Sequence, residues 1–223
     1  MPLTIAIDGP VGAGKSSVAD AVAQRLGILH LDTGAMYRAV GLAALDAKID
    51  PKNQEAVCAL CAQGGAQVDV RYHNGAQATL VNGQDVSDRI RTQEAGMAAS
   101  CVSRYLPVRQ MLVRRQRELS QCQPMLLDGR DIGTVVLPDA TVKIYLTASA
   151  EARAKRRWLE LHEKGDPITL EQVLEDVQQR DYNDTHRDVA PLRQAEDAVL
   201  VDTTECDLEE SYQLLLKTIR ERI

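Results

Sequence analysis

The chain has 223 residues, of which 44% are hydrophobic and 26% charged, and its formal net charge is −6 at pH 7. This length fits one domain with a substantial core. The negative charge argues against binding to a nucleic-acid polymer, and no stretch approaches the roughly 20 apolar residues of a membrane span. A strand candidate begins at Leu3, so we expect no leader peptide, and five scattered cysteines indicate the reduced thiols of a cytoplasmic protein.

A phosphate-binding loop is predicted near the N-terminus. Residues 9–16 read GPVGAGKS and match the pattern G-x-x-x-x-G-K-[ST]. They lie between an apolar run of strand length at 3–8 and helically spaced apolar residues at 17–26. The glycines let backbone N–H groups approach a polyphosphate, Lys15 can reach the β- and γ-phosphates, and the Ser16 hydroxyl can ligate Mg²⁺. The alternative, a glycine-rich turn with a chance lysine, does not explain this strand–loop–helix context.

The following elements alternate between strand and helix until the pattern changes at residue 64. Residues 28–31 read as a short strand, and helical patterns cover 34–48 and 53–63. Strand alternation then covers 66–72 and 78–81, and the pairs Asn74-Gly75 and Asn82-Gly83 are hairpin-turn signals. We therefore predict a small antiparallel β insert over residues 64–88.

The rest of the chain alternates between helices and buried strands. Helices are expected near 92–103 and 105–122, broken around Pro107, and strands at 125–127 and 142–146. A basic helix over 149–164 is followed by a loop at 165–167, and Thr169 with Gln172 fits a capping box for a helix that ends near residue 186. A strand at 198–201 and a helix from residue 208 follow. This order predicts an α/β fold of the P-loop NTPase type, an open parallel sheet with helices on both faces.

Three polar turns follow predicted strands directly. They are Asp8-Gly9, Asp32-Thr33-Gly34 and residues 128–131, which read DGRD. Ligands of open parallel sheets bind beyond the carboxyl ends of the strands, so these turns should meet around the phosphate loop. Asp32 or Asp128 could hold Mg²⁺ through water, and the sequence does not choose between them.

The basic residues are 19 Arg and only 7 Lys. Because the planar guanidinium binds phosphate through two hydrogen bonds, an acidic chain that concentrates Arg can gather it around a small polyanion. Pairing with Glu on helix surfaces is the alternative, and we expect it for Arg114, Arg115 and Arg117. The C-x-x-C pair Cys58 and Cys61 lies in a helix-like stretch without a second pair, so we expect a buried helix face there.

Three further segments each combine Arg with Asp, Thr or Tyr. They are residues 32–38 (DTGAMYR), 127–136 (LDGRDIGTVV) and 180–187 (RDYNDTHR). Arg binds phosphate, and Asp accepts hydrogen bonds from sugar hydroxyls or base amines. For any one segment, a local Arg–Asp ion pair that fixes a loop is the alternative.

Together with the phosphate loop, IRTQE at 90–94 and APL at 190–192, these segments resemble the nucleoside monophosphate kinases, and within them the bacterial cytidylate kinase family. The resemblance covers nearly the whole chain, and DGRDIGTVV and RDxxDxxR are much narrower signals than the P-loop. It implies transfer of the γ-phosphoryl of ATP, with Mg²⁺, to CMP or dCMP by a cytoplasmic enzyme, which we expect to be a monomer. The insert at 64–88 would be the monophosphate-binding region, and residues 153–168 would be a lid that closes on ATP.

The resemblance also assigns roles to individual residues. It implies that ATP is bound by Gly9, Pro10, Val11, Gly12, Ala13, Gly14, Lys15, Ser16, Ser17, Arg153 and Arg157, with Ser16 on the metal. It implies that the acceptor is bound by Thr33, Arg38, Ser100, Arg109, Arg130, Asp131, Arg180, Asp184 and Arg187. Among these, Ser100, Arg109 and Asp131 would read cytosine, and Asp184 with Arg180 would contact the sugar. Lys15, Arg130, Arg180 and Arg187 would stabilise the transferring group.

The chemistry agrees with this assignment. A nucleoside monophosphate is largely a dianion at neutral pH because its second pKa is about 6, so the attacking oxygen needs no general base. Accordingly, His30, His73, His162 and His186 need not be catalytic. Two alternatives remain: a kinase for AMP, UMP or shikimate, and a non-enzymatic nucleotide switch. A guanine-binding switch should carry N-K-x-D, and the sequence contains no such tetrapeptide.

Overall fold

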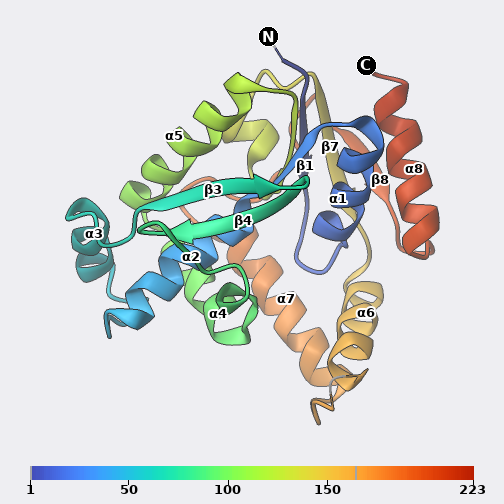
Figure 1. Ribbon diagram of the computed structural model, residues 1–223. Coiled ribbons are helices and arrows are strands. Elements are labelled where there is room, and N and C mark those ends of the chain that lie inside the picture. The colour runs from blue at the N-terminus through green and yellow to red at the C-terminus, as the bar shows by residue number, and fades with distance from the viewer. Residues whose placement is uncertain (1, 164) are drawn as a thin grey trace. The chain divides into compact units, whose positions relative to one another are not determined.

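A parallel sheet and an antiparallel sheet lie in different units of the chain (Figure 1). The computed structural model describes residues 2–163 and 165–223; residue 164, which falls in the predicted basic helix and lid, lies outside the described residues. Unit 1 is formed by Leu29–Met125 with Pro2, and unit 2 by Leu3–Ile28 and Leu126–Ile223. Within the described part of the chain, no helix is both long enough and apolar enough to cross a membrane.

The parallel strands of unit 2 run in the order β6-β1-β7-β8. Their bounds are β1 Thr4–Asp8, β6 Met125–Gly129, β7 Val142–Thr147 and β8 Val199–Asp202. Strand β7 pairs in parallel with both β1 and β8, which places Ile7 opposite Ile144 and Leu146 opposite Val201. Strand β6 is buried along its whole length, and this explains why it reads as a continuous apolar run. The predicted α/β fold is confirmed.

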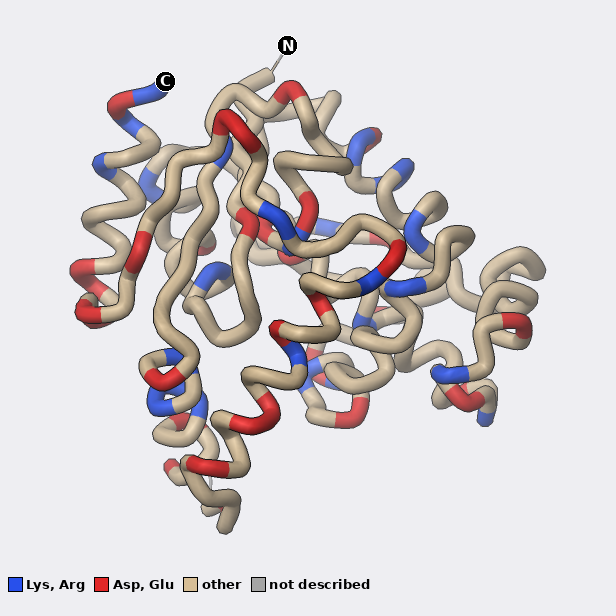
Figure 2. Tube along the Cα trace, turned by 180° about the vertical axis from the view of Figure 1, so that it is seen from behind, with Lys and Arg blue, Asp and Glu red and all other residues tan. Residues whose placement is uncertain are grey.

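Helices α1 (Lys15–Leu26) and α8 (Leu208–Arg220) lie side by side and pack on these strands through Val22, Leu215 and Ile219 (Figure 1). Helix α8 begins with a capping box and carries acidic residues in its first turn and basic residues in its last, as the red and blue segments leading to the C-terminus show in Figure 2. Both charge placements stabilise the helix dipole.

Helices α6 (Ala150–Glu163) and α7 (Leu170–His186) form a hairpin with its own apolar contact among Ala154, Val173 and Val177. The capping box predicted at Thr169 and Gln172 opens α7 and is confirmed. Between β6 and β7, residues Ile132–Val136 form a short π-helix, η2, which the sequence did not predict.

Unit 1 contains strand β2 and most of the remaining helices. Their bounds are β2 Leu29–Asp32, α2 Thr33–Asp46, α3 Gln54–Ala62, the single 3₁₀ turn η1 Arg89–Arg91, α4 Gln93–Val102 and α5 Leu106–Cys122. Helices α2 and α4 pack closely because residue 41 is glycine: an added Cβ there would lie 2.7 Å from the Cβ of Ala98. The predicted break at Pro107 is wrong. The chain breaks at 103–105, and Pro107 lies in the first turn of α5, where its missing N–H is not needed.

The antiparallel sheet predicted in residues 64–88 is present in unit 1. It consists of β3 (Val68–His73), β4 (Ala76–Val81) and β5 (Gln84–Asp85). Both Asn-Gly pairs form the connecting turns, and all four residues have positive φ, as two-residue hairpin turns require. The sheet also holds β2: the Gln77 side chain bonds both backbone groups of Asp32, and the Tyr72 hydroxyl donates to the carbonyl of His30. The insert therefore fixes the end of a strand that carries predicted site residues.

Candidate active site

The phosphate loop lies between the end of β1 and the start of α1. Gly9 is required because an added Cβ would lie 1.9 Å from the carbonyl oxygen of Leu146. Gly12 and Gly14 have positive φ, 74° and 78°, so the loop turns where an L side chain would be strained. Helix α1 begins at Lys15, and the unpaired N–H groups and dipole of its first turn favour an anion in front of the loop.

Lys15 is buried, with its ammonium donating to the carbonyl of Pro10 at 2.7 Å. Burial, and then repulsion from Arg130, lowers the pKa of Lys15 from 10.5 to about 7. The neutral carbonyl of Pro10 compensates the positive charge of Lys15 only in part. A phosphate oxygen would supply the opposite charge that the Pro10 carbonyl cannot.

The Ser16 hydroxyl donates to a carboxylate oxygen of Asp128 at 2.8 Å, and Asp128 is buried at the end of β6. A hydroxyl and a carboxylate oxygen are the kind of ligands that Mg²⁺ prefers. Asp32 is differently engaged: one carboxylate oxygen caps α2 through the N–H of Ala35, and the other accepts from Arg38 at 2.6 Å. Of the two carboxylates that the sequence left open, these contacts favour Asp128.

A cluster of guanidinium groups follows the phosphate loop in unit 2. Arg130 donates through Nε to Asp184 at 2.7 Å, which joins the loop after β6 to α7. Partial desolvation, and then repulsion from Arg130, lowers the pKa of Arg180, whose side chain is otherwise exposed. Because Arg130 disfavours the charged forms of both Lys15 and Arg180, positive potential is concentrated here. Three of the predicted catalytic residues thus form one electrostatic group.

Asp131 is buried, and one of its carboxylate oxygens lies 3.6 Å from Nη2 of Arg187. The backbone after Asp131 is held by Asp8, whose two carboxylate oxygens accept the N–H groups of Ile132 and Gly133, each at 2.7 Å. The sequence placed Asp8 in a polar turn after a strand but assigned it no role. Its strand-end position was the only signal available.

Arg153 lies against the phosphate loop from the side of α6. Its guanidinium donates to the carbonyls of Ala148 and Val11 and binds both oxygens of Asp181, at 3.0 and 2.6 Å. An added Cβ on Gly12 would lie 3.3 Å from the Cβ of Arg153. Arg153 is therefore held by protein acceptors on three segments of unit 2. The neighbouring Arg156 donates to the carbonyls of Thr203 and Cys206, so it ties α6 to the loop after β8. Arg157, by contrast, is exposed and pairs with Glu160 one turn along α6.

In unit 1, Arg38 folds back over the first turn of α2 onto Asp32. Gly34 allows this, because an added Cβ would lie 3.0 Å from Asp32 Oδ1 and 3.3 Å from Arg38 Nη1. Nε of Arg38 is buried and has no hydrogen-bond partner among residues 2–163 and 165–223. Thr33, at the start of α2, is also buried. An anion acceptor would satisfy the buried donor of Arg38.

The other predicted residues of unit 1 meet at the α4–α5 junction. Arg109 is buried on α5, where it donates to the carbonyl of Ser103 at 3.3 Å and lies 5.7 Å from the ring centre of Tyr37. Ser103 in turn donates to the carbonyl of Ser100 at 3.1 Å. Ser100 and Arg109 are therefore close in this unit, as base-reading partners would need to be.

Of the arginines on α5 that were expected to pair with Glu, Arg115 does so. The buried helix face expected at the C-x-x-C pair is wrong, because Cys58 and Cys61 are half-buried and Val57 is the buried residue of α3. Arg115 pairs with Glu118 and also binds Asp69 of β3. Burial raises the pKa of Cys61 to about 11 and raises the pKa of Cys58, so both thiols stay protonated and unreactive. The described residues contain no cluster of three or more His, Cys, Asp or Glu side chains suited to a metal ion.

Comparison with known proteins agrees with this arrangement. A family model described as cytidylate kinase matches residues 5–221. The cytidylate kinase of Thermosipho melanesiensis is 47% identical, covering 100% of this chain and 99% of the relative. That of Geobacter sp. is 48% identical, covering 98% and 93%. The chain belongs to the cytidylate kinase family.

The family membership confirms the resemblance carried by residues 127–136 and 180–192, and it makes the chain a nucleoside monophosphate kinase. A third relative, the cytidylate kinase of Caldicellulosiruptor saccharolyticus, is 47% identical and covers 96% of this chain and 94% of its own. A crystal structure of an uncharacterized protein from Eubacterium ventriosum shares the fold, with a TM-score of 0.52 at 10% identity over 99% of each chain.

From the contacts of Arg153 we predict that replacing it lowers the stability of the protein, whereas replacing Arg157 on the same helix does not. Arg153→Ala leaves Asp181 and two carbonyls without their donor, so we expect a loss of about 3 kcal/mol in the free energy of unfolding. Arg157→Ala removes only an exposed pair and should cost less than about 0.5 kcal/mol. Urea unfolding of both variants tests this. A raised KM for ATP without a loss of stability in Arg153→Ala would contradict it.

The lowered pKa of Lys15 predicts a pH dependence of stability. Between pH 7 and 10.5 the unfolded chain binds more protons at Lys15 than the folded chain, so wild-type stability rises with pH in that window. The free energy of unfolding of the wild type minus that of Lys15→Met should therefore increase by about 2 kcal/mol from pH 7 to pH 9. Urea melts of both proteins without nucleotide measure this difference. A difference independent of pH would show that Lys15 keeps its ordinary pKa.

Proposed function

We propose that the chain transfers the γ-phosphoryl group of ATP to CMP and dCMP, forming CDP and dCDP. Beside the family membership, one observation carries this proposal: Lys15 and Arg180 both have pKa values lowered by desolvation and by Arg130, next to a phosphate loop. Such a group of mutually repelling cations is stabilised by a polyanion. It suits transfer of a phosphoryl group between two phosphate-bearing substrates.

The triphosphate of ATP would lie on the backbone N–H groups of residues 9–17, with Lys15 at the β- and γ-phosphates. Ser16 and Asp128 would hold Mg²⁺, because their oxygens are adjacent and suited to it. Bound there, Mg²⁺ would neutralise charge on the β- and γ-phosphate oxygens. Lys15 would exchange the Pro10 carbonyl for a phosphate oxygen and so regain a fully charged ammonium.

The acceptor phosphate would be held by arginines. Arg130, Arg180 and Arg187 of unit 2 would neutralise the acceptor and the transferring group, and Asp184 would fix Arg130 and contact the sugar. Arg38 of unit 1 offers a buried donor for a phosphate oxygen. Because the acceptor is a dianion, these residues need only position it and cancel its charge, and no side chain has to remove a proton.

Recognition of cytosine would depend on Asp131, with Ser100 and Arg109. A carboxylate can accept from the exocyclic amine of cytosine, whereas a guanidinium and a hydroxyl can donate to the ring acceptors. Uracil has a carbonyl in place of the amine and would leave the buried Asp131 without its donor. Thr33 and the insert at 64–88 would complete the monophosphate region, since Gln77 of the insert holds the strand end next to Thr33.

A coupled assay of ADP release tests the proposed function. The purified chain with Mg·ATP should phosphorylate CMP and dCMP, and it should turn over UMP, AMP and shikimate at least about 10-fold less efficiently. Lys15→Ala serves as the control for contaminating kinases and should lose at least about 100-fold in turnover. AMP, UMP or shikimate as the preferred acceptor would favour the alternative kinases. ATP binding without turnover of any acceptor would favour a nucleotide switch.

If Asp131 reads the base, Asp131→Ala should lower kcat/KM for CMP by about 10- to 150-fold, because a buried hydrogen bond to a charged group is lost. The preference for CMP over UMP should narrow, and the affinity for ATP should change little. If Asp131 only shapes its loop, both acceptors should lose the same factor and the melting temperature should fall. Kinetics with both acceptors and a melting curve on one variant separate these outcomes.

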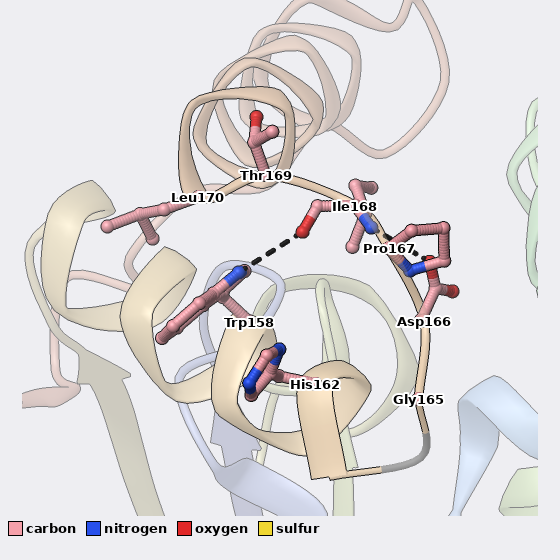
Figure 3. Close-up of a pocket in the computed structure, with 8 residues that line it drawn as sticks. All are labelled: Trp158, His162, Gly165, Asp166, Pro167, Ile168, Thr169 and Leu170. Atoms are coloured by element: carbon pink, nitrogen blue, oxygen red, sulfur yellow. Dashed lines mark hydrogen bonds between the residues drawn. The ribbon is translucent and has the colours of Figure 1, made fainter.

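We further propose that the predicted lid at 153–168 moves through its outer part. Arg153 and Arg156 anchor the base of α6, so motion should be confined to the segment from Arg157 onward. At the tip, a pocket of about 440 Å³ lies between α6 and the loop at 165–170 (Figure 3). There Trp158 stacks on His162, and its indole N–H donates to the carbonyl of Ile168 at 3.1 Å.

Closure of this tip over ATP would exclude water and suppress wasteful hydrolysis. Hydrogen exchange with and without ATP and CMP tests the proposal. Backbone amides from residue 157 to 168 should gain protection with both nucleotides, and those near Arg153 should already be protected without them. Equal exchange in the two states at the tip would exclude a lid in this segment.

A further inference from the structure

The carboxylate of Asp8 has an unusual position for a charged group. It lies at the end of β1, is 4% exposed, and accepts the N–H groups of two consecutive residues, Ile132 and Gly133, each at 2.7 Å. Burial raises the pKa of Asp8 to about 6, and the two backbone hydrogen bonds work against that rise. A buried carboxylate thus lies at the start of the phosphate loop, and both of its oxygens accept backbone hydrogen bonds from the segment after Asp131.

That segment needs an external acceptor. Asp131 has φ −148° and ψ 28°, outside the strand and helix regions, and the π-helix η2 begins directly after it. The first N–H groups of any helix lack partners within the helix. In η2 the carbonyl of Asp131 accepts from Val135 and Val136, while Ile132 and Gly133 donate to Asp8. Asp8 therefore caps η2 from a different strand and fixes the peptide planes next to Asp131.

Lys143 of β7 also packs beside this segment. An added Cβ on Gly133 would lie 3.2 Å from Cδ of Lys143 and 3.4 Å from Oδ2 of Asp8. Lys143 is itself held, because its ammonium binds both oxygens of Asp197 at 2.9 and 2.7 Å. The side chains of Asp8 and Lys143 therefore leave no room for a side chain at Gly133.

We propose that Asp8 is a positioning residue for the acceptor nucleotide: by fixing the backbone after Asp131, it sets the direction of the Asp131 and Arg130 side chains. This inference rests on the proposed (d)CMP kinase function. Each oxygen of the Asp8 carboxylate accepts one of the two N–H groups, so both peptide planes are fixed by one side chain. A displacement of about 1 Å at a reacting or binding group can cost about 100-fold, so the fixed backbone matters for the acceptor more than for ATP.

Two variants test the inference from opposite sides. Asp8→Asn keeps the size of the side chain but presents an amide donor to one of the two N–H groups. Gly133→Ala leaves the carboxylate intact and pushes the segment away from Lys143 and Asp8. In both we expect KM for CMP to rise by about 10- to 100-fold and the CMP-over-UMP preference to narrow, with KM for ATP changed by less than about twofold.

A matched control separates positioning from stability. Leu215→Ala removes a fully buried side chain from the core of the same unit and lies on α8, away from the residues that contact η2. It should lower the melting temperature and leave KM for CMP and the CMP-over-UMP ratio unchanged. If Asp8→Asn and Gly133→Ala behave like Leu215→Ala, Asp8 only stabilises the fold and the inference is overturned.

Hydrogen exchange provides a readout that does not depend on activity. Without nucleotide, the amides of Ile132 and Gly133 should exchange faster in Asp8→Asn than in the wild type, and those of β7 should not change. Unchanged exchange at both amides would overturn the inference. If the wild type does not phosphorylate CMP, the proposed function fails, while the exchange experiment still reports whether Asp8 holds this backbone. If Asp8→Asn does not fold, an unchanged KM for CMP in Gly133→Ala overturns it.

Discussion

Buried charge around the phosphate loop is the constraint on which the rest of this structure depends. Moving an ion from water into a protein costs several kcal/mol unless partners surround it. In unit 2 three cations near the loop each have a partner: Lys15 the carbonyl of Pro10, the partly buried Arg130 the carboxylate of Asp184, and Arg153 both oxygens of Asp181. The partners come from α7 and from the loop itself. The fold must therefore bring α7 next to the loop to keep these charges inside.

These cations differ in how many protein acceptors surround them, and this difference distinguishes structural cations from those suited to bind a ligand. Arg153 has two carbonyls and a carboxylate, so no part of its guanidinium requires a ligand. Lys15 has one neutral carbonyl and a lowered pKa, and Arg180 also has a lowered pKa. Arginines that look alike in the sequence thus differ in what surrounds them. Arg153 joins the loop to α7, whereas Lys15 and Arg180 carry charges that an anion would stabilise.

The sequence predicted the elements that depend on local signals. The phosphate loop, both Asn-Gly turns and the capping box at Thr169 follow from short patterns whose geometry is set by neighbouring residues. The π-helix after Asp131 was not predicted, because its first N–H groups donate to Asp8, more than 120 residues away in sequence. The distinction between Arg153 and Arg157 also needed the structure, since both lie in one basic helix.

Asp32 and Asp128 show the same limit in the candidate metal site. Each follows a strand and precedes a glycine or a Thr-Gly pair, so sequence patterns do not distinguish which of them is the carboxylate beside Mg²⁺. Their surroundings differ because Asp32 caps α2 and binds Arg38, which occupies both of its oxygens, whereas Asp128 accepts from Ser16 of the phosphate loop. The choice depends on contacts between distant segments.

Protonation connects this electrostatic arrangement to nucleotide binding. With a pKa of about 7, Lys15 is only partly charged at neutral pH when its partner is a carbonyl. A phosphate favours the ammonium form, so a triphosphate that reaches Lys15 raises its pKa and draws a proton into the site. The full positive charge would thus be present when there is a phosphate to neutralise it. At neutral pH the folded protein without nucleotide still bears most of the cost of burying this lysine, and a bound phosphate that raises the pKa of Lys15 would remove that cost.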